Sequence, residues 1–194
     1  MIKVLLILLI LNHVSLRAQA STNHLVKAQI GLGFARDEIQ TTASSSTIAS
    51  NKNYNQLEIA PQLNYFVDPN FAIGTYYFYK SFMANITSSG IGAYGRYYFK
   101  SINTVLSKKL DNKNLTLTPT WTPYAQLGAK TETLEAETVS ISFSGLEAGG
   151  GVDWHFTENY FLNFALNLSF QLSGDTRTLN SQSFLIGFGK ALNF

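Results

Sequence analysis

The sequence predicts an all-β fold: an eight-stranded antiparallel transmembrane β-barrel of the up-and-down meander type. Apolar and polar residues alternate with a period of two through eight segments, which is typical of strands that separate two environments. A hydrophobic content of 45% with a mean hydropathy of +0.03 indicates fine mixing of the two classes. Only helices and closed barrels satisfy their backbone groups in lipid, so a membrane protein of this composition is predicted to be a barrel.

The amino terminus has the pattern of a secretory signal peptide. Lys3 precedes an apolar run from Val4 to Leu11, and Ala18 and Ala20 form a small-x-small cleavage pattern. The apolar run is too short to cross a bilayer, and a buried helix is the alternative. We expect a signal peptide over residues 1–20 and a single barrel domain over residues 21–194.

Each of the eight segments is about as long as the roughly 9–11 residues that a tilted strand needs to cross a bilayer. Eight is an even number, as bacterial single-chain barrels require. The segments are Leu25–Arg36, Tyr54–Phe66, Phe71–Lys80, Gly90–Phe99, Thr120–Lys130, Val139–Phe156, Tyr160–Phe170 and Ser183–Phe194.

The first four segments each have one apolar face. The apolar rows of the first, second and fourth are Val26, Ala28, Ile30, Leu32 and Phe34; Leu57, Ile59, Pro61, Leu63 and Tyr65; and Ile91, Ala93, Tyr97 and Phe99. The third segment follows the second through the tight turn Val67-Asp68-Pro69-Asn70. Their opposite faces hold polar or small residues, which predicts a polar environment there.

The last four segments repeat this pattern. Their apolar rows include Ala125, Leu127 and Ala129 in the fifth; Tyr160, Leu162, Phe164, Leu166, Leu168 and Phe170 in the seventh; and the even-numbered residues of the eighth except Lys190. In the sixth, the apolar residues are odd-numbered up to Phe143 and even-numbered from Leu146. This change of phase predicts a β-bulge near Gly145.

The connections differ in length as barrel loops do. Long polar connections, expected to be extracellular, are Asp37–Asn53, Ser81–Ser89, Thr131–Thr138 and Gln171–Asn180, whereas the periplasmic turns are short. Lys100–Pro119 is an exception, because it is long and falls on the periplasmic side. The spacing of Ile102, Val105, Leu106 and Leu110 permits a short helix there, and a disordered loop is the alternative.

Aromatic residues gather at the predicted periplasmic ends of the strands. Barrels carry aromatic girdles at both membrane boundaries, so this clustering independently favours a membrane barrel. The residues are Tyr65, Phe66, Phe71, Tyr97, Tyr98, Phe99, Trp121, Tyr124, Trp154, Phe156, Tyr160, Phe161 and Phe194.

Several stretches resemble a known family. Gly189, Leu192 and Phe194 are similar to the carboxy-terminal signal that the barrel-assembly machinery reads, and Pro61–Phe66, Asn70–Gly74 and Arg96–Phe99 carry the rest of the likeness. The chain resembles the small outer-membrane β-barrel domain of the OmpA/OmpX type, in the porin-family version of Bacteroidetes-type bacteria, without a peptidoglycan-binding domain. The resemblance implies the outer membrane of a Gram-negative bacterium, contact with its lipid, and periplasmic chaperones and assembly machinery as partners during biogenesis.

Charged residues collect on the face opposite the apolar rows. They are Lys27, Glu58, Lys80, Arg96, Lys130, Glu147 and Asp153, with His155 beside them. The interior of an eight-stranded barrel is just wide enough for side chains to fill it, so we expect a paired polar core. The predicted partner of Arg96 is Glu58 or Glu147. An ion or proton path along the same residues, and hence a narrow porin-like channel, is the alternative.

Other chemistries find little support. The 14 basic and 12 acidic residues become 12 and 12 once Lys3 and Arg17 leave with the signal peptide, which gives no reason to expect nucleic-acid binding. The absence of cysteine excludes a lipoprotein anchor and disulfides. His13 lies in the signal peptide, His24 and His155 map to the periplasmic end, and no Gly-x-Ser-x-Gly motif is present. We expect neither catalysis, nor a cofactor, nor a metal site.

The remaining prediction is a structural or surface-interaction protein. The longest outer connection, Asp37–Asn53, is where an extracellular ligand would bind, because binding residues tend to lie on loops. A soluble, exported, lipocalin-like binder of an apolar ligand is the rival, and it requires the apolar rows to point inward. Periodicity alone does not decide which face is inside.

Overall fold

The computed structural model describes residues 25–41, 50–81, 86–103, 106–110, 113–117, 120–136, 139–157, 159–173 and 177–193. The predicted signal peptide and Phe194 lie outside these ranges. The strands are β1 (Leu25–Thr41), β2 (Ser50–Asp68), β3 (Phe71–Ser81), β4 (Ile86–Tyr98), β5 (Ile102–Asn103), β6 (Leu106–Leu110), β7 (Lys113–Leu117), β8 (Thr120–Ala136), β9 (Val139–His155), β10 (Tyr160–Leu172) and β11 (Arg177–Asn193). No helix among the described residues is both long and apolar enough to span a membrane.

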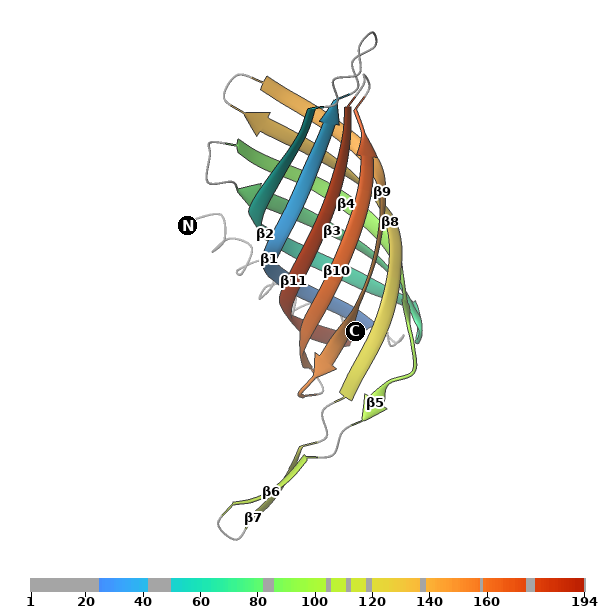
Figure 1. The fold of residues 1–194 in the computed structure, drawn as a ribbon. Helices are drawn as coiled ribbons and strands as arrows, with labels where there is room; N and C mark the ends of the chain where they lie inside the picture. The colour runs from blue at the N-terminus through green and yellow to red at the C-terminus, as the bar shows by residue number, and fades with distance from the viewer. Residues whose placement is uncertain are drawn as a thin grey trace.

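Eight long strands form a closed antiparallel barrel (Figure 1). Neighbours along the chain pair with each other, and the β1–β11 and β4–β8 pairings complete the ring. Following paired residues once around the barrel from Gln29 leads back to β1 at Ile39, ten residues further along. This stagger tilts the strands and sets the width of the interior. The predicted meander is confirmed.

The apolar rows face outward, and the polar rows face inward. Phe34, Leu127 and Leu166 are 67%, 66% and 57% exposed, whereas the side chains of Lys80 and Arg96 are each 1% exposed. A soluble lipocalin-like protein needs the opposite arrangement, so that reading of the sequence is wrong. An apolar exterior around a polar core is the arrangement of membrane barrels.

The barrel has two different ends. At the terminal end, β1 begins and β11 ends, and short turns connect β2 to β3 and β9 to β10. In the first of these turns Asp68 Oδ1 accepts hydrogen bonds from the amides of Asn70 and Phe71, at 2.7 and 2.8 Å. Such bonding to its own backbone explains why an aspartate begins this turn. The opposite, distal end carries the β1–β2, β3–β4, β8–β9 and β10–β11 hairpins.

The strands reach further at the distal end than the sequence analysis expected. β1 includes Asp37 and continues to Thr41, while β8 continues to Ala136. Most of the predicted connections Asp37–Asn53 and Thr131–Thr138 therefore belongs to strands. Polar residues hid these extensions, because outward-facing positions beyond the apolar band resemble loop sequence.

The β-bulge predicted near Gly145 is wrong. The pairing of β9 with β8 and with β10 is regular through this glycine. Phe143 is instead an inward-facing residue, 1% exposed, in a small apolar cluster inside the distal end. A register shift does occur elsewhere, between Phe66 and Asp68 of β2.

The short helix considered for Lys100–Pro119 is also wrong. β5 pairs with the start of β8, and β6 pairs with β7 as a separate two-stranded hairpin. This hairpin is drawn at the terminal end of the barrel, as the sequence placed it (Figure 1). Over the five residues Leu106–Leu110, periodicity does not distinguish a strand from a helix.

Candidate functional site: the barrel lumen

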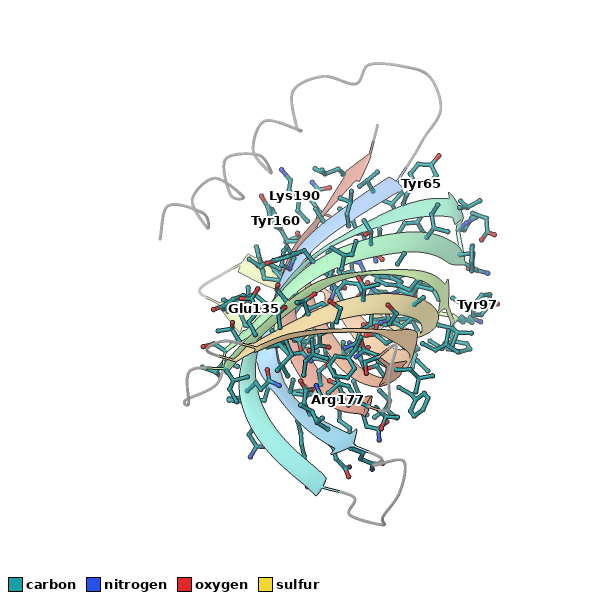
Figure 2. The ribbon with its side chains drawn as sticks, turned by 90° about the horizontal axis from the view of Figure 1, so that it is seen from above. Tyr65, Tyr97, Glu135, Tyr160, Arg177 and Lys190 are labelled. Atoms are coloured by element: carbon teal, nitrogen blue, oxygen red, sulfur yellow. The ribbon has the colours of Figure 1, made fainter. Side chains whose placement is uncertain are left out.

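The lumen brings together all seven charged residues that the sequence predicted there. Each is less than 9% exposed: Lys27, Glu58, Lys80, Arg96, Lys130, Glu147 and Asp153. They come from β1, β2, β3, β4, β8 and β9 and form layers between the distal and terminal ends. Figure 2 shows side chains on both faces of the strands, with Tyr65 and Tyr97 at the outer edge of the molecule.

The distal layer is an ion cluster centred on Lys80. Its Nζ lies 3.0 Å from Asp37 Oδ2 and 2.9 Å from Glu132 Oε1, and Lys130 Nζ lies 3.1 Å from Glu132 Oε2. All four side chains are 6% exposed or less. Buried charges are stable only when paired and hydrogen-bonded, so each member depends on the others.

Neutral groups complete this distal cluster. Gln56 donates a hydrogen bond to Asp37, while Ser88 and Gln171 donate to Glu132 at 2.7 and 3.1 Å. Lys80 also donates to Ser181 Oγ at 3.2 Å. Beyond the cluster, the distal end is filled by an apolar group of side chains: Leu134, Phe143 and Leu179, packed against Ile39, Ile86 and Ile141.

The middle layer is organised around Arg96, and it corrects a prediction. The guanidinium bonds neither Glu58 nor Glu147. Its Nε and Nη2 donate to Gln126 Oε1 at 3.0 and 2.6 Å, and it lies over the Tyr124 ring, 3.9 Å from the ring centroid. Neutral oxygens and aromatic faces therefore stabilise this cation.

Glu147 is held by donors other than cations. Tyr76 Oη donates to Glu147 Oε2 at 2.6 Å, and Gln126 Nε2 lies 3.5 Å from Glu147 Oε1. The same Gln126 amide donates to Asn167 at 3.0 Å. Because Gln126 also accepts from Arg96, it connects the arginine to the carboxylate in one network.

The terminal layer pairs Lys27 with Asp153. Lys27 Nζ lies 2.8 Å from Asp153 Oδ2, and Asn163 donates to Asp153 Oδ1 at 2.7 Å. The ammonium also lies 4.7 Å from the ring centroid of Tyr98 and 5.0 Å from that of Phe161. His155, half-buried, packs against the Phe161 ring at a centroid distance of 5.4 Å.

The predicted aromatic girdle divides between two faces. Tyr98, Tyr124 and Phe161 are buried inside the terminal end, and the Phe66 ring stacks on Tyr98. Tyr65, Phe71, Tyr97, Phe99, Phe156 and Tyr160 are exposed on the outside. The prediction placed all of these residues in one ring. The alternation of successive residues between the two faces of each strand separates the inner group from the outer group.

Two members of the distal cluster were missed by the sequence analysis. Asp37 and Glu132 had been assigned to loops. The alternation of residues along each strand is sufficient to place them in the lumen. Asp37 continues the inward row that begins with Lys27, and Glu132 continues the row through Gln126 and Lys130.

Small residues make room for the lumen network. A Cβ atom on Gly92 would lie 2.3 Å from Tyr76 Cε1, so Gly92→Ala is expected to displace the ring that donates to Glu147. Overpacking of this kind costs about 1–3 kcal/mol of unfolding free energy. Urea titration of the refolded chain measures it. Gly187→Ala, whose Cβ would meet its nearest atoms at 3.4 Å, is the control expected to stay near the wild type.

Known proteins resemble this chain in fold. Neither a protein-family model nor a curated protein matches the sequence. Among solved structures, Neisserial surface protein A matches with a TM-score of 0.53 at 12% identity, over 89% of this chain and 99% of that one. The amino-terminal β-barrel domain of Pseudomonas aeruginosa OprF matches with a TM-score of 0.51 at 13% identity, over 88% and 98%.

At these identities the likeness concerns the fold. It is the small outer-membrane barrel fold that the sequence predicted, and the apolar exterior of this chain agrees with it. Together they confirm an eight-stranded barrel with the fold of small outer-membrane proteins. The predicted resemblance to a Bacteroidetes version stays a prediction.

Proposed function

We propose that the chain is an integral outer-membrane protein with a closed lumen, which uses its distal hairpins for interactions at the cell surface and performs no catalysis. The lumen network supports the closed state, because ion pairs, amides and aromatic rings occupy successive layers from Glu132 to Lys27. A barrel of this width is filled by side chains rather than by water.

The single observation that supports the surface role is that some strands extend beyond their neighbours at the distal end. Among the described residues, pairing of β2 with β3 starts at Leu57, although β2 begins at Ser50. Pairing of β9 with β10 likewise starts at Ser144, although β9 begins at Val139. Strand edges without a neighbour are templates for an added strand from another protein.

Biogenesis and sidedness belong to the same proposal. We assign the terminal end to the periplasm and the distal end to the exterior, since short turns gather at the periplasmic side of such barrels. Gly189 and Leu192, two residues of the predicted assembly signal, lie in β11. Periplasmic chaperones and the barrel-assembly machinery are the partners expected during export.

The closed lumen is tested by conductance. We expect the chain, refolded and inserted into planar lipid bilayers, to give no stepwise current under conditions in which a known porin conducts. Regular openings in the wild type would contradict the closed state and favour the channel reading. Glu132→Gln removes the carboxylate that pairs with Lys80 and Lys130, so it is the variant expected to open a path for ions. A current seen in this variant and not in the wild type would support a lumen closed by side chains.

The surface role is tested by shortening one hairpin. Residues 38–53 are replaced by a two-residue turn between Asp37 and Tyr54, which are paired across β1 and β2; this removes most of the unpaired edge of β2 and keeps Asp37 and its ion pair. We expect cells that display this variant to lose adhesion relative to cells with the full chain, at equal surface amounts. Unchanged adhesion would remove the role of this hairpin, while the closed-lumen proposal would stand on the conductance result.

A further inference from the structure

The buried charges of the lumen do not balance. Among the described residues, five carboxylates and four cations are less than 9% exposed. The carboxylates are Asp37, Glu58, Glu132, Glu147 and Asp153; the cations are Lys27, Lys80, Arg96 and Lys130. An isolated charge in such surroundings is costly, so the excess negative charge requires compensation.

The excess is located at Glu58. The other four carboxylates each accept hydrogen bonds: Asp37 from Lys80, Glu132 from Lys80 and Ser88, Glu147 from Tyr76, and Asp153 from Lys27 and Asn163. Glu58 is 5% exposed, and its Oε2 is a buried atom without a hydrogen-bond partner.

The nearby cations form their ion pairs with other carboxylates and not with Glu58. Lys80 is its paired residue across β2 and β3, yet the Lys80 ammonium bonds Asp37 and Glu132. Lys130 likewise bonds Glu132. Glu58 remains within electrostatic range of Asp37, Lys80, Lys130 and Glu132, and of Tyr76 on β3.

Two more unpaired acceptors belong to the same cluster. Gln56 Oε1 and Gln171 Oε1 are buried without hydrogen-bond partners, and these side chains are 3% and 0% exposed. Their amide groups are oriented by donation to Asp37 and Glu132, so exchanging oxygen and nitrogen would break those bonds. The cluster therefore lacks positive charge and donors, but not acceptors.

We propose that the distal cluster is a binding site for one small monovalent cation, either a proton or an alkali-metal ion, held at the Glu58 carboxylate. A proton would turn Glu58 into a neutral acid that donates one hydrogen bond. A sodium ion would use oxygen ligands, which hard cations prefer. The two occupants share the same chemistry, one positive charge among oxygens, and experiment distinguishes them.

Infrared spectroscopy tests for the proton. If a proton is the occupant, the full chain, refolded in detergent at neutral pH, should show the carbonyl band of a protonated carboxylic acid, which Glu58→Gln removes. Labelling glutamate with carbon-13 assigns the band in the wild type, even if the variant fails to fold. Glu135→Gln, which changes an exposed glutamate of β8 at the same, distal end of the barrel, is the control that should keep the band.

Thermal unfolding tests for the alkali ion. If sodium is the occupant, the transition temperature of the wild type should rise by about 3 °C for each tenfold increase in NaCl above the dissociation constant. Choline chloride at equal ionic strength should not reproduce this rise, and Glu58→Gln should abolish it while Glu135→Gln should not. A sodium effect shared by all three proteins would be a general salt effect and would contradict the proposal. So would a band that persists in Glu58→Gln, or the absence of both signals.

Discussion

Replacing Lys80 by methionine is expected to lower the free energy of unfolding by about 3–5 kcal/mol, the usual cost of breaking a buried ion pair by removing one partner. The change keeps an unbranched apolar stem but deletes the ammonium that bonds Asp37 and Glu132. Glu132 retains Lys130, whereas Asp37 is left with Gln56 as its donor. Urea titration of the refolded chain in lipid vesicles, followed by tryptophan fluorescence, measures the loss.

A double variant shows whether charge is the cause. Lys80→Met combined with Asp37→Asn removes the stranded carboxylate and is expected to recover part of the loss, which a double-mutant cycle quantifies. Lys100→Met changes an exposed lysine and should leave stability near the wild type. If Lys80→Met cost no more than Lys100→Met, the distal cluster would not be the stabilising centre that its geometry indicates.

The barrel could be predicted because apolar and polar residues alternate along each strand. Leu162, Phe164 and Leu166 lie on one face of β10 whichever strands pair with it. The structure shows that this face is the outer one. The charged lumen followed from the same rule. Asp37 and Glu132 also follow this alternation. They were missed only because the predicted strands ended before these residues.

The partners inside the lumen could not be predicted. Arg96 bonds Gln126, its paired residue on the neighbouring strand β8, and not Glu58, so its partner depends on the register of β4 with β8, which periodicity alone does not give. A single pairing error would change every cross-lumen neighbour. The β6–β7 hairpin was missed for a different reason: five-residue strands are too short for periodicity to distinguish them from a helix.

Replacing Leu166 by arginine tests the outward face of the barrel. Leu166 is 57% exposed near the middle of β10, between Phe164 and Leu168 on the same face. Arginine at the midplane of a bilayer costs a membrane barrel about 2–4 kcal/mol. In water the same exposed substitution should change stability by less than about 0.5 kcal/mol. Urea titration in lipid vesicles should therefore show a large loss.

The position of the substitution supplies the control. Leu172 is 53% exposed at the distal end of the same strand, where the cost of arginine falls to about 0–1 kcal/mol near the interface. The two leucines have similar exposure, so a difference between Leu166→Arg and Leu172→Arg reports depth in the bilayer rather than lost packing. Equal small effects at both positions would mean that this face of the barrel is not embedded in lipid, however apolar it is.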